Sequence, residues 1–183
     1  MQKMSVRTRV LTGAVALAAV GAGTFGALSA SAAPQTAEAR PAADVKKSDT
    51  VTSTHLSIAA ATKAAQAALA AAEQENQRVT VAVVDRNGNT LVTLRGDGAG
   101  PQSYESAERK AFTAVSWNAP TSELVKRLAQ APNLKDIPGT LFLGGGAPVA
   151  VQGAPIAGIG VAGAPSGDLD EKFAQAGVAA LGK

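Results

Sequence analysis

The chain has 183 residues and no cysteine, which excludes disulfide bridges, thiolate metal sites, iron–sulfur clusters and covalent c-type haem attachment. It carries 17 basic and 14 acidic residues. Three of the basic residues, Lys3, Arg7 and Arg9, lie in the first 33 positions, which hold no acid, so 14 of each remain in the rest of the chain. That balance lacks the positive excess of a nucleic-acid-binding domain, and we expect no nucleic-acid partner.

The N-terminal segment has the three parts of a secretory signal peptide. Its basic start is followed by an apolar run at 10–28 and by a small-residue cleavage sequence at 29–33. A retained transmembrane anchor is the alternative, but glycines interrupt the apolar run and cleavage residues follow it. The next stretch has almost no large apolar side chains and should be flexible. We therefore expect a secreted or envelope-associated protein with a signal peptide (1–33), a tether (34–53) and one domain (54–183).

The first half of the domain predicts a helix followed by a β-hairpin. Ser57 can cap a helix over 58–76, whose alanines form a stripe of small residues at helical spacing. The segment 79–85 is apolar on both faces, as in a central strand. The Asn-Gly pair at 87–88 is a strong turn signal, and the returning strand should span 90–95.

The second half predicts helices at 103–117 and 121–130 and a closing helix that is capped by Ser166 or Asp168. Between them lie three strand candidates, at 140–143, 148–152 and 156–161. The order is helix, two strands, two helices, three strands, helix. Because the strand connections are hairpins, the expected fold is α/β, with an antiparallel sheet of about five strands and helices packed on it.

Three stretches of the domain resemble the GlcG/HbpS family, and the likeness runs from about Leu56 to the C-terminus. They are VTVAVVDRNGNTLVTLRGDGA, SYESAERKAFTAVSW and IPGTLFLGGGAPVAVQGAPIAGIGVAGA, in this order. The likeness is strongest to the secreted haem-binding members. The resemblance implies a profilin-like sheet flanked by helices, a homo-oligomer such as an octamer, non-covalent binding of haem b and of an iron ion outside the membrane, and modulation of a membrane sensor histidine kinase in redox or haem stress.

Two residues are candidates for binding haem. His55 is the only histidine, and imidazole is the commonest neutral ligand of haem iron. The alternative is a partly exposed residue at the entrance of a helix. Thr140 lies in the stretch where the resemblance implies a threonine ligand, although a β-branched residue at the start of a strand needs no further explanation. Thr113, in the middle of a helix, is a poorer candidate.

Glu105 and Glu108 are candidates for binding iron. Three positions apart on a helix, they share a face with Cβ atoms about 5–6 Å apart and can hold a hard cation. Acids in a first helical turn also complement the helix dipole, which is the competing explanation. The resemblance favours iron. Arg109 and Lys110 follow at once, either as partners of haem propionates or of the carboxylates, or as a solvated face.

The leading functional hypothesis is a secreted haem- and iron-binding protein. The alternatives are an enzyme that degrades haem, and a binding module for another planar cofactor such as a corrinoid. The glycines at 144–146 are not a phosphate loop, because no Gly-Lys-Ser/Thr follows them and they join strands. No catalytic triad or zinc spacing is present, so we name no catalytic residue.

Overall fold

The computed structural model describes residues 43–182, so the expected signal peptide and the first nine residues of the expected tether lie outside the described part. A 3-10 turn, η1, lies within the remainder of the expected tether, and the domain follows it. None of the described helices is long and apolar enough to cross a membrane. The elements are η1 (Lys47–Asp49), α1 (Ile58–Gln74), β1 (Thr80–Asp85), β2 (Thr90–Arg95), α2 (Gln102–Trp117), α3 (Thr121–Arg127), η2 (Pro132–Asp136), β3 (Gly146–Val151), β4 (Ala154–Ala162) and α4 (Gly167–Leu181).

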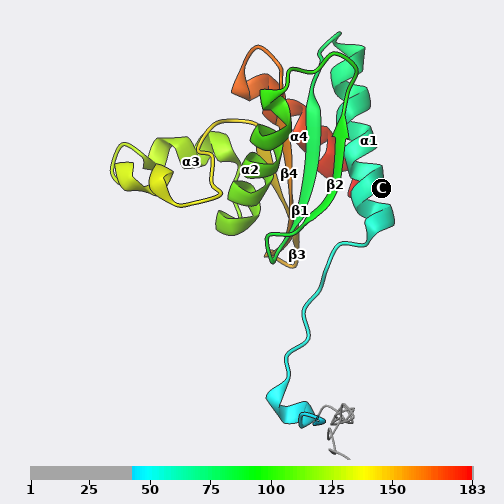
Figure 1. The fold of residues 1–183 in the computed structure, drawn as a ribbon, viewed down its shortest axis with the longest axis vertical. Coiled ribbons are helices and arrows are strands. Elements are labelled where there is room, and N and C mark those ends of the chain that lie inside the picture. Colours follow the sequence, from blue (N-terminus) through cyan, green and yellow to red (C-terminus); the bar gives the residue numbers. More distant parts are fainter. Residues whose placement is uncertain (1–42, 183) are drawn as a thin grey trace, which may run out of the picture. The chain divides into compact units, whose positions relative to one another are not determined.

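The fold class predicted from the sequence is confirmed: an antiparallel sheet carries helices on both faces (Figure 1). The strand order is β2-β1-β4-β3, which places β1 inside the sheet as its two apolar faces predict. The edge strand β3 contains Pro148, which pairs with Gly158 of β4. The helix caps are also as predicted, since the Ser57 and Ser166 hydroxyls accept hydrogen bonds from the first turns of α1 and α4.

The predicted strand at 140–143 is wrong, and the sheet has four strands instead of five. The backbone N–H groups of this segment donate to nearby carbonyls and to a side chain of α2, and not to a neighbouring strand. Thr140 N–H donates to the carbonyl of Ile137, and Leu143 N–H donates to that of Leu141. Leu141 N–H donates to the Thr113 hydroxyl of α2. The segment is therefore a loop fastened to a helix.

The two faces of the sheet are packed in different ways. On one face, α1 and α4 cover an apolar cluster that includes Val81 and Val83 of β1 and many alanines of α1. On the other face, α2 crosses directly over β4. A Cβ atom added at Gly158 or Gly160 would overlap the backbone carbonyls of Ala111 or Ala107. The glycines of β4 therefore allow the helix backbone to lie against the strand backbone.

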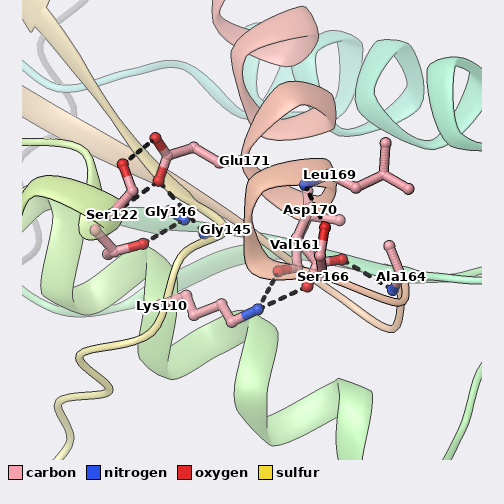
Figure 2. Close-up of polar contacts among 11 residues, drawn as sticks. Lys110, Ser122, Gly145, Gly146, Val161, Ala164, Ser166, Leu169, Asp170 and Glu171 are labelled. Carbon is pink, nitrogen blue, oxygen red and sulfur yellow. Dashed lines mark hydrogen bonds and ion pairs between the residues drawn. The ribbon is translucent and has the colours of Figure 1, made fainter. Parts of the chain in front are cut away.

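A buried ion pair joins α2 to α4 (Figure 2). The Lys110 side chain is only 2 % exposed, and its Nζ lies 2.7 Å from Oδ2 of Asp170. Nζ also donates to the carbonyl of Val161 at 3.0 Å, while Oδ1 of Asp170 accepts from Ala164 N–H at 3.0 Å. The expected solvated or haem-facing position of Lys110 is therefore wrong, because this lysine is part of the core.

Glu171, the next residue of α4, binds the start of α3 close to this ion pair. The Glu171 carboxylate accepts hydrogen bonds from the Ser122 backbone N–H at 2.9 Å and from the Ser122 hydroxyl at 2.6 Å. Close by, Gly146 N–H donates to the Thr121 hydroxyl at 2.8 Å. The first turn of α4 thus holds α2 through Asp170 and the start of α3 through Glu171 (Figure 2).

Burial raises the pKa of Asp170, and the nearby Lys110 charge and backbone hydrogen bonds offset this rise only in part. In the variant Lys110→Met, the carboxylate loses its counter-charge and can only become neutral by taking up a proton. We expect this variant to lose about 3–5 kcal/mol of unfolding free energy at pH 7, as for other broken buried pairs. The loss should shrink as the pH falls towards 5, because the folded state then binds a proton that the unfolded state, with an ordinary pKa near 3.8, does not bind.

Urea unfolding between pH 5 and pH 7 measures this effect. Lys172→Met is the matched control, because it removes an ion pair with Glu75 in which both side chains are well exposed. That change should cost less than about 1 kcal/mol. A loss in Lys110→Met that is equally large at every pH would contradict the role assigned to Asp170.

Candidate functional site

Helix α2 carries two of the four predicted site residues, Glu105 and Glu108. The Glu105 side chain is 78 % exposed, and its Oε1 lies 3.5 Å from Nη1 of Arg109, one turn further along the helix. Glu108 instead faces the sheet, where its Oε1 accepts a hydrogen bond from the Thr93 hydroxyl of β2 at 3.1 Å. Both glutamates therefore lie on one helix, as predicted, but their carboxylates have different neighbours. No group of three or more metal-ligating side chains is present within residues 43–182.

A surface hollow of about 290 Å³ lies between α2, the β1–β2 hairpin and the loop before Thr140. Glu108 and Arg109 form its charged part, and the Phe112 ring forms its apolar wall. The ring lies beside two glycines, since an added Cβ would be 2.8 Å from it at Gly88 and 3.6 Å from it at Gly139. Both glycines have positive φ, +88° and +80°, and so suit turns that leave this ring uncovered by neighbouring side chains.

Thr140 is the residue after Gly139, which lines the hollow, but its own side chain is buried. It is 1 % exposed, and its hydroxyl donates to the carbonyl of Ile137 at 2.7 Å. Its own backbone carbonyl accepts a hydrogen bond from Nη2 of Arg109 at 2.8 Å. Arg109 therefore links two of the predicted residues, because the same guanidinium lies beside Glu105 and holds the backbone of Thr140.

His55 lies apart from the hollow's lining, in the exposed stretch before α1. Its Nε2 is 2.7 Å from the Ser53 hydroxyl. The imidazole is near enough to the β1–β2 turn to act on Asp85. Burial would raise the pKa of Asp85, but hydrogen bonds from Asn89 and Asn87, together with the charge of His55, lower it below its ordinary value. The structure thus places His55 near the end of the hairpin where Asp85 lies.

Sequence reasoning missed Phe112, Thr93 and the two glycines of the hollow. Phe112 lies four positions after Glu108, so helical spacing alone indicated that the two share a face. Thr93 and Gly139 had no such signal, because they reach α2 only through the packing of the sheet and of the loop.

The chain matches one family model over residues 56–179, described as haem degrading protein HbpS-like. It is 35% identical over 113 residues to an uncharacterised 15.0 kDa protein of Citrobacter freundii, covering 59% of this chain and 80% of that protein. It is also 31% identical over 121 residues to the corrinoid adenosyltransferase PduO of the same organism. That match covers 63% of this chain but only 36% of the enzyme.

Solved structures agree with the sequence matches. A double mutant of Streptomyces reticuli HbpS, in which two glutamates are replaced by aspartate, is 73% identical, with a TM-score of 0.76 over 79% of this chain and 99% of that one. A PduOC:heme complex is 30% identical, with a TM-score of 0.64 over 69% of this chain and 95% of that one. With its helix-flanked antiparallel sheet and its match over most of the domain, the chain belongs to the HbpS-like family.

Proposed function

We propose that this protein binds haem b non-covalently at the hollow beside α2. The observation that carries the proposal is the grouping of the Phe112 ring, the Arg109 guanidinium and the glycine turns around one opening, with Thr140 next in the chain. Two relatives support it: the matching family is described as haem degrading, and one related structure is a complex with haem.

The residues around the hollow fit an edge of a haem. An aromatic face suits a flat ring, and a guanidinium suits a propionate because it can donate two parallel hydrogen bonds. Its volume of about 290 Å³ is just below the range typical of sites for drug-sized ligands, so it can enclose only part of a porphyrin. The candidate iron ligands are His55, which is exposed in the stretch before α1, and Thr140, which is buried next to Gly139 of the hollow.

The proposal includes an iron-ion site at Glu105 and Glu108. Two carboxylates on adjacent turns offer the oxygen ligands that hard cations prefer, with water completing the shell. Glu105 and Glu108 are also the only two glutamates of the chain that lie three positions apart. The glutamates replaced in the Streptomyces reticuli double mutant have the same spacing in that protein's numbering, which supports equating the two pairs.

We also propose that the protein assembles into a homo-oligomer larger than a dimer. An apolar groove of about 360 Å³ lies between the start of α1, the end of α4 and the edge strand β3. Its lining is mostly aliphatic and includes the well-exposed Val151, and Ile58 at the start of α1 is also well exposed. Burying such a surface against a second copy is favourable. An assembly would also cover the part of a haem that one hollow leaves exposed.

The proposed setting is outside the cytoplasmic membrane, where the protein would report haem or redox stress to a membrane sensor histidine kinase. Its support is the signal-peptide pattern of residues 1–33 and the family resemblance. Haem degradation is a second candidate activity, which the description of the family favours. Corrinoid binding is a third, favoured by the match to part of a corrinoid adenosyltransferase.

Absorbance titrations with haemin and with cobalamin, run in parallel, test the ligand. We expect a Soret shift with haemin that saturates, and a spectrum that changes in Thr140→Ala or in His55→Ala, according to which residue binds the iron. Thr140→Ser, which keeps a hydroxyl, is the matched control for the first change. No saturable haemin binding would refute the function. A spectrum unaltered in both alanine variants would refute only the ligand assignment.

Incubating the haem-loaded protein with a reductant in air tests haem degradation. Opening of the porphyrin ring with repeated turnover would establish this enzymatic activity.

The double variant Glu105→Gln/Glu108→Gln tests the cation site. It keeps side-chain size and helix propensity but removes both charges, so iron binding measured by calorimetry should fall at least tenfold. Haemin binding should change little. The control Glu73→Gln/Glu123→Gln removes two charges elsewhere and should leave iron binding intact. If the pair serves only the helix dipole, the first variant loses about 1 kcal/mol of stability and binds iron normally.

Analytical ultracentrifugation tests the assembly. The mature chain should sediment as a species larger than a dimer at micromolar concentration. Val151→Glu, which places a charge at the apolar groove, should shift this species towards smaller ones, while Lys172→Glu, at the exposed Lys172–Glu75 pair, should not. A wild-type chain that sediments only as a monomer would rule out the oligomer.

A further inference from the structure

The position of Thr140 poses an access problem for the proposed function, on which this inference rests. Its hydroxyl is buried and already donates to Ile137, so in this conformation it cannot meet a ligand in the hollow. Either the residue has no ligand role, or the segment that carries it must move. The contacts of this segment show what would have to break.

Two side chains of α2, one turn apart, hold consecutive backbone groups of the segment. Nη2 of Arg109 donates to the carbonyl of Thr140 at 2.8 Å. The hydroxyl of Thr113 accepts the N–H of Leu141 at 2.7 Å. Thr113 is fully buried, and its hydroxyl proton goes to the Arg109 carbonyl at 2.7 Å, which fixes the hydroxyl oxygen as the acceptor for Leu141. The two residues are thus oriented by the helix towards one short loop.

Phe142, which is 8 % exposed and packs in an apolar cluster with Leu124, anchors the far end of the segment, so the part that can open is 137–141. Gly139, with φ of +80°, precedes Thr140, and Ile137 before it is 40% exposed. Arg109 has another partner close by, since Glu105 lies 3.5 Å from its Nη1. A guanidinium released from the Thr140 carbonyl therefore stays at the rim of the hollow, where it can pair with an anionic group.

We propose that Arg109 and Thr113 are positioning residues that latch the segment 137–141 closed, and that haem reaches Thr140 only when the latch opens. The latch is defined by the two hydrogen bonds, from Arg109 to the Thr140 carbonyl and from Leu141 N–H to Thr113. Weakening it raises the fraction of open molecules, and the rate of haem association rises with that fraction.

The variants Thr113→Val and Arg109→Gln test the latch on the full mature chain. Thr113→Val keeps the shape of the side chain but removes the acceptor of Leu141 N–H. Ser116→Ala is the matched control, because the Ser116 hydroxyl makes the same bond to a carbonyl one turn back, that of Phe112, at an exposed position of the helix. The fold of each variant is monitored by far-ultraviolet circular dichroism, which reports the helices and the sheet and not the loop.

The first measurement is hydrogen exchange of the peptide spanning 137–143 without ligand. We expect exchange to be about tenfold faster in either latch variant, which is equivalent to ~1.4 kcal/mol. In Ser116→Ala the exchange rate should not change. The second is haemin association by stopped flow, which should accelerate by a similar factor in Thr113→Val; Arg109→Gln is read by exchange alone, because it also removes the proposed propionate partner. A merely structural role for these residues would not speed up association.

The outcomes separate the latch from the proposed function. Unchanged exchange in both variants would overturn the latch, whatever haemin does. Faster exchange with unchanged haemin association would overturn the claim that the latch controls access to Thr140. Failure of the wild type to bind haemin would refute the proposed function, while the exchange data would still decide whether Arg109 and Thr113 hold the loop.

Discussion

The close contact between α2 and β4 is the constraint on which the other features depend. It exists because Gly158 and Gly160 have no Cβ, so the helix backbone can lie directly on the strand. At this depth, the long side chain of Lys110 reaches Asp170 beyond the strand end instead of solvent. The same depth brings Glu108 to Thr93 and Arg109 to the loop. A larger residue at position 158 or 160 would push α2 away from the sheet, and with it the site residues that α2 carries.

One helix therefore serves two purposes on opposite sides. Its inner side is anchored through Lys110, whose charge is matched by a buried carboxylate and a carbonyl. Its outer side keeps Glu105, Arg109 and Phe112 available at the surface. Replacing a buried ion pair by apolar residues is often neutral or stabilising, so stability alone does not explain the pair. Its directional bonds do fix the rotation of α2, and that rotation decides which residues face the hollow.

Local signals made much of the fold predictable from the sequence. The caps Ser57 and Ser166, the Asn-Gly turn and the two-sided apolar strand each depend on neighbouring residues in the chain. The same is true of Glu105 and Glu108, whose shared helix follows from spacing. The segment 140–143 was misjudged because its β-branched and apolar residues resemble a strand, whereas its N–H groups bind nearby carbonyls and, at Leu141, a distant threonine. Lys110 was misjudged for the same reason, since its partner lies 60 positions away.

The proline in β3 has a consequence for how copies of this chain can meet. An edge strand normally offers a row of donors and acceptors on which another sheet can be extended. Pro148 removes one of these donors in the middle of β3, so a strand from a second molecule would find an incomplete ladder there. Contact between copies on this side is therefore left to side chains, and association through side chains can close on itself, whereas sheets joined edge to edge grow into fibres.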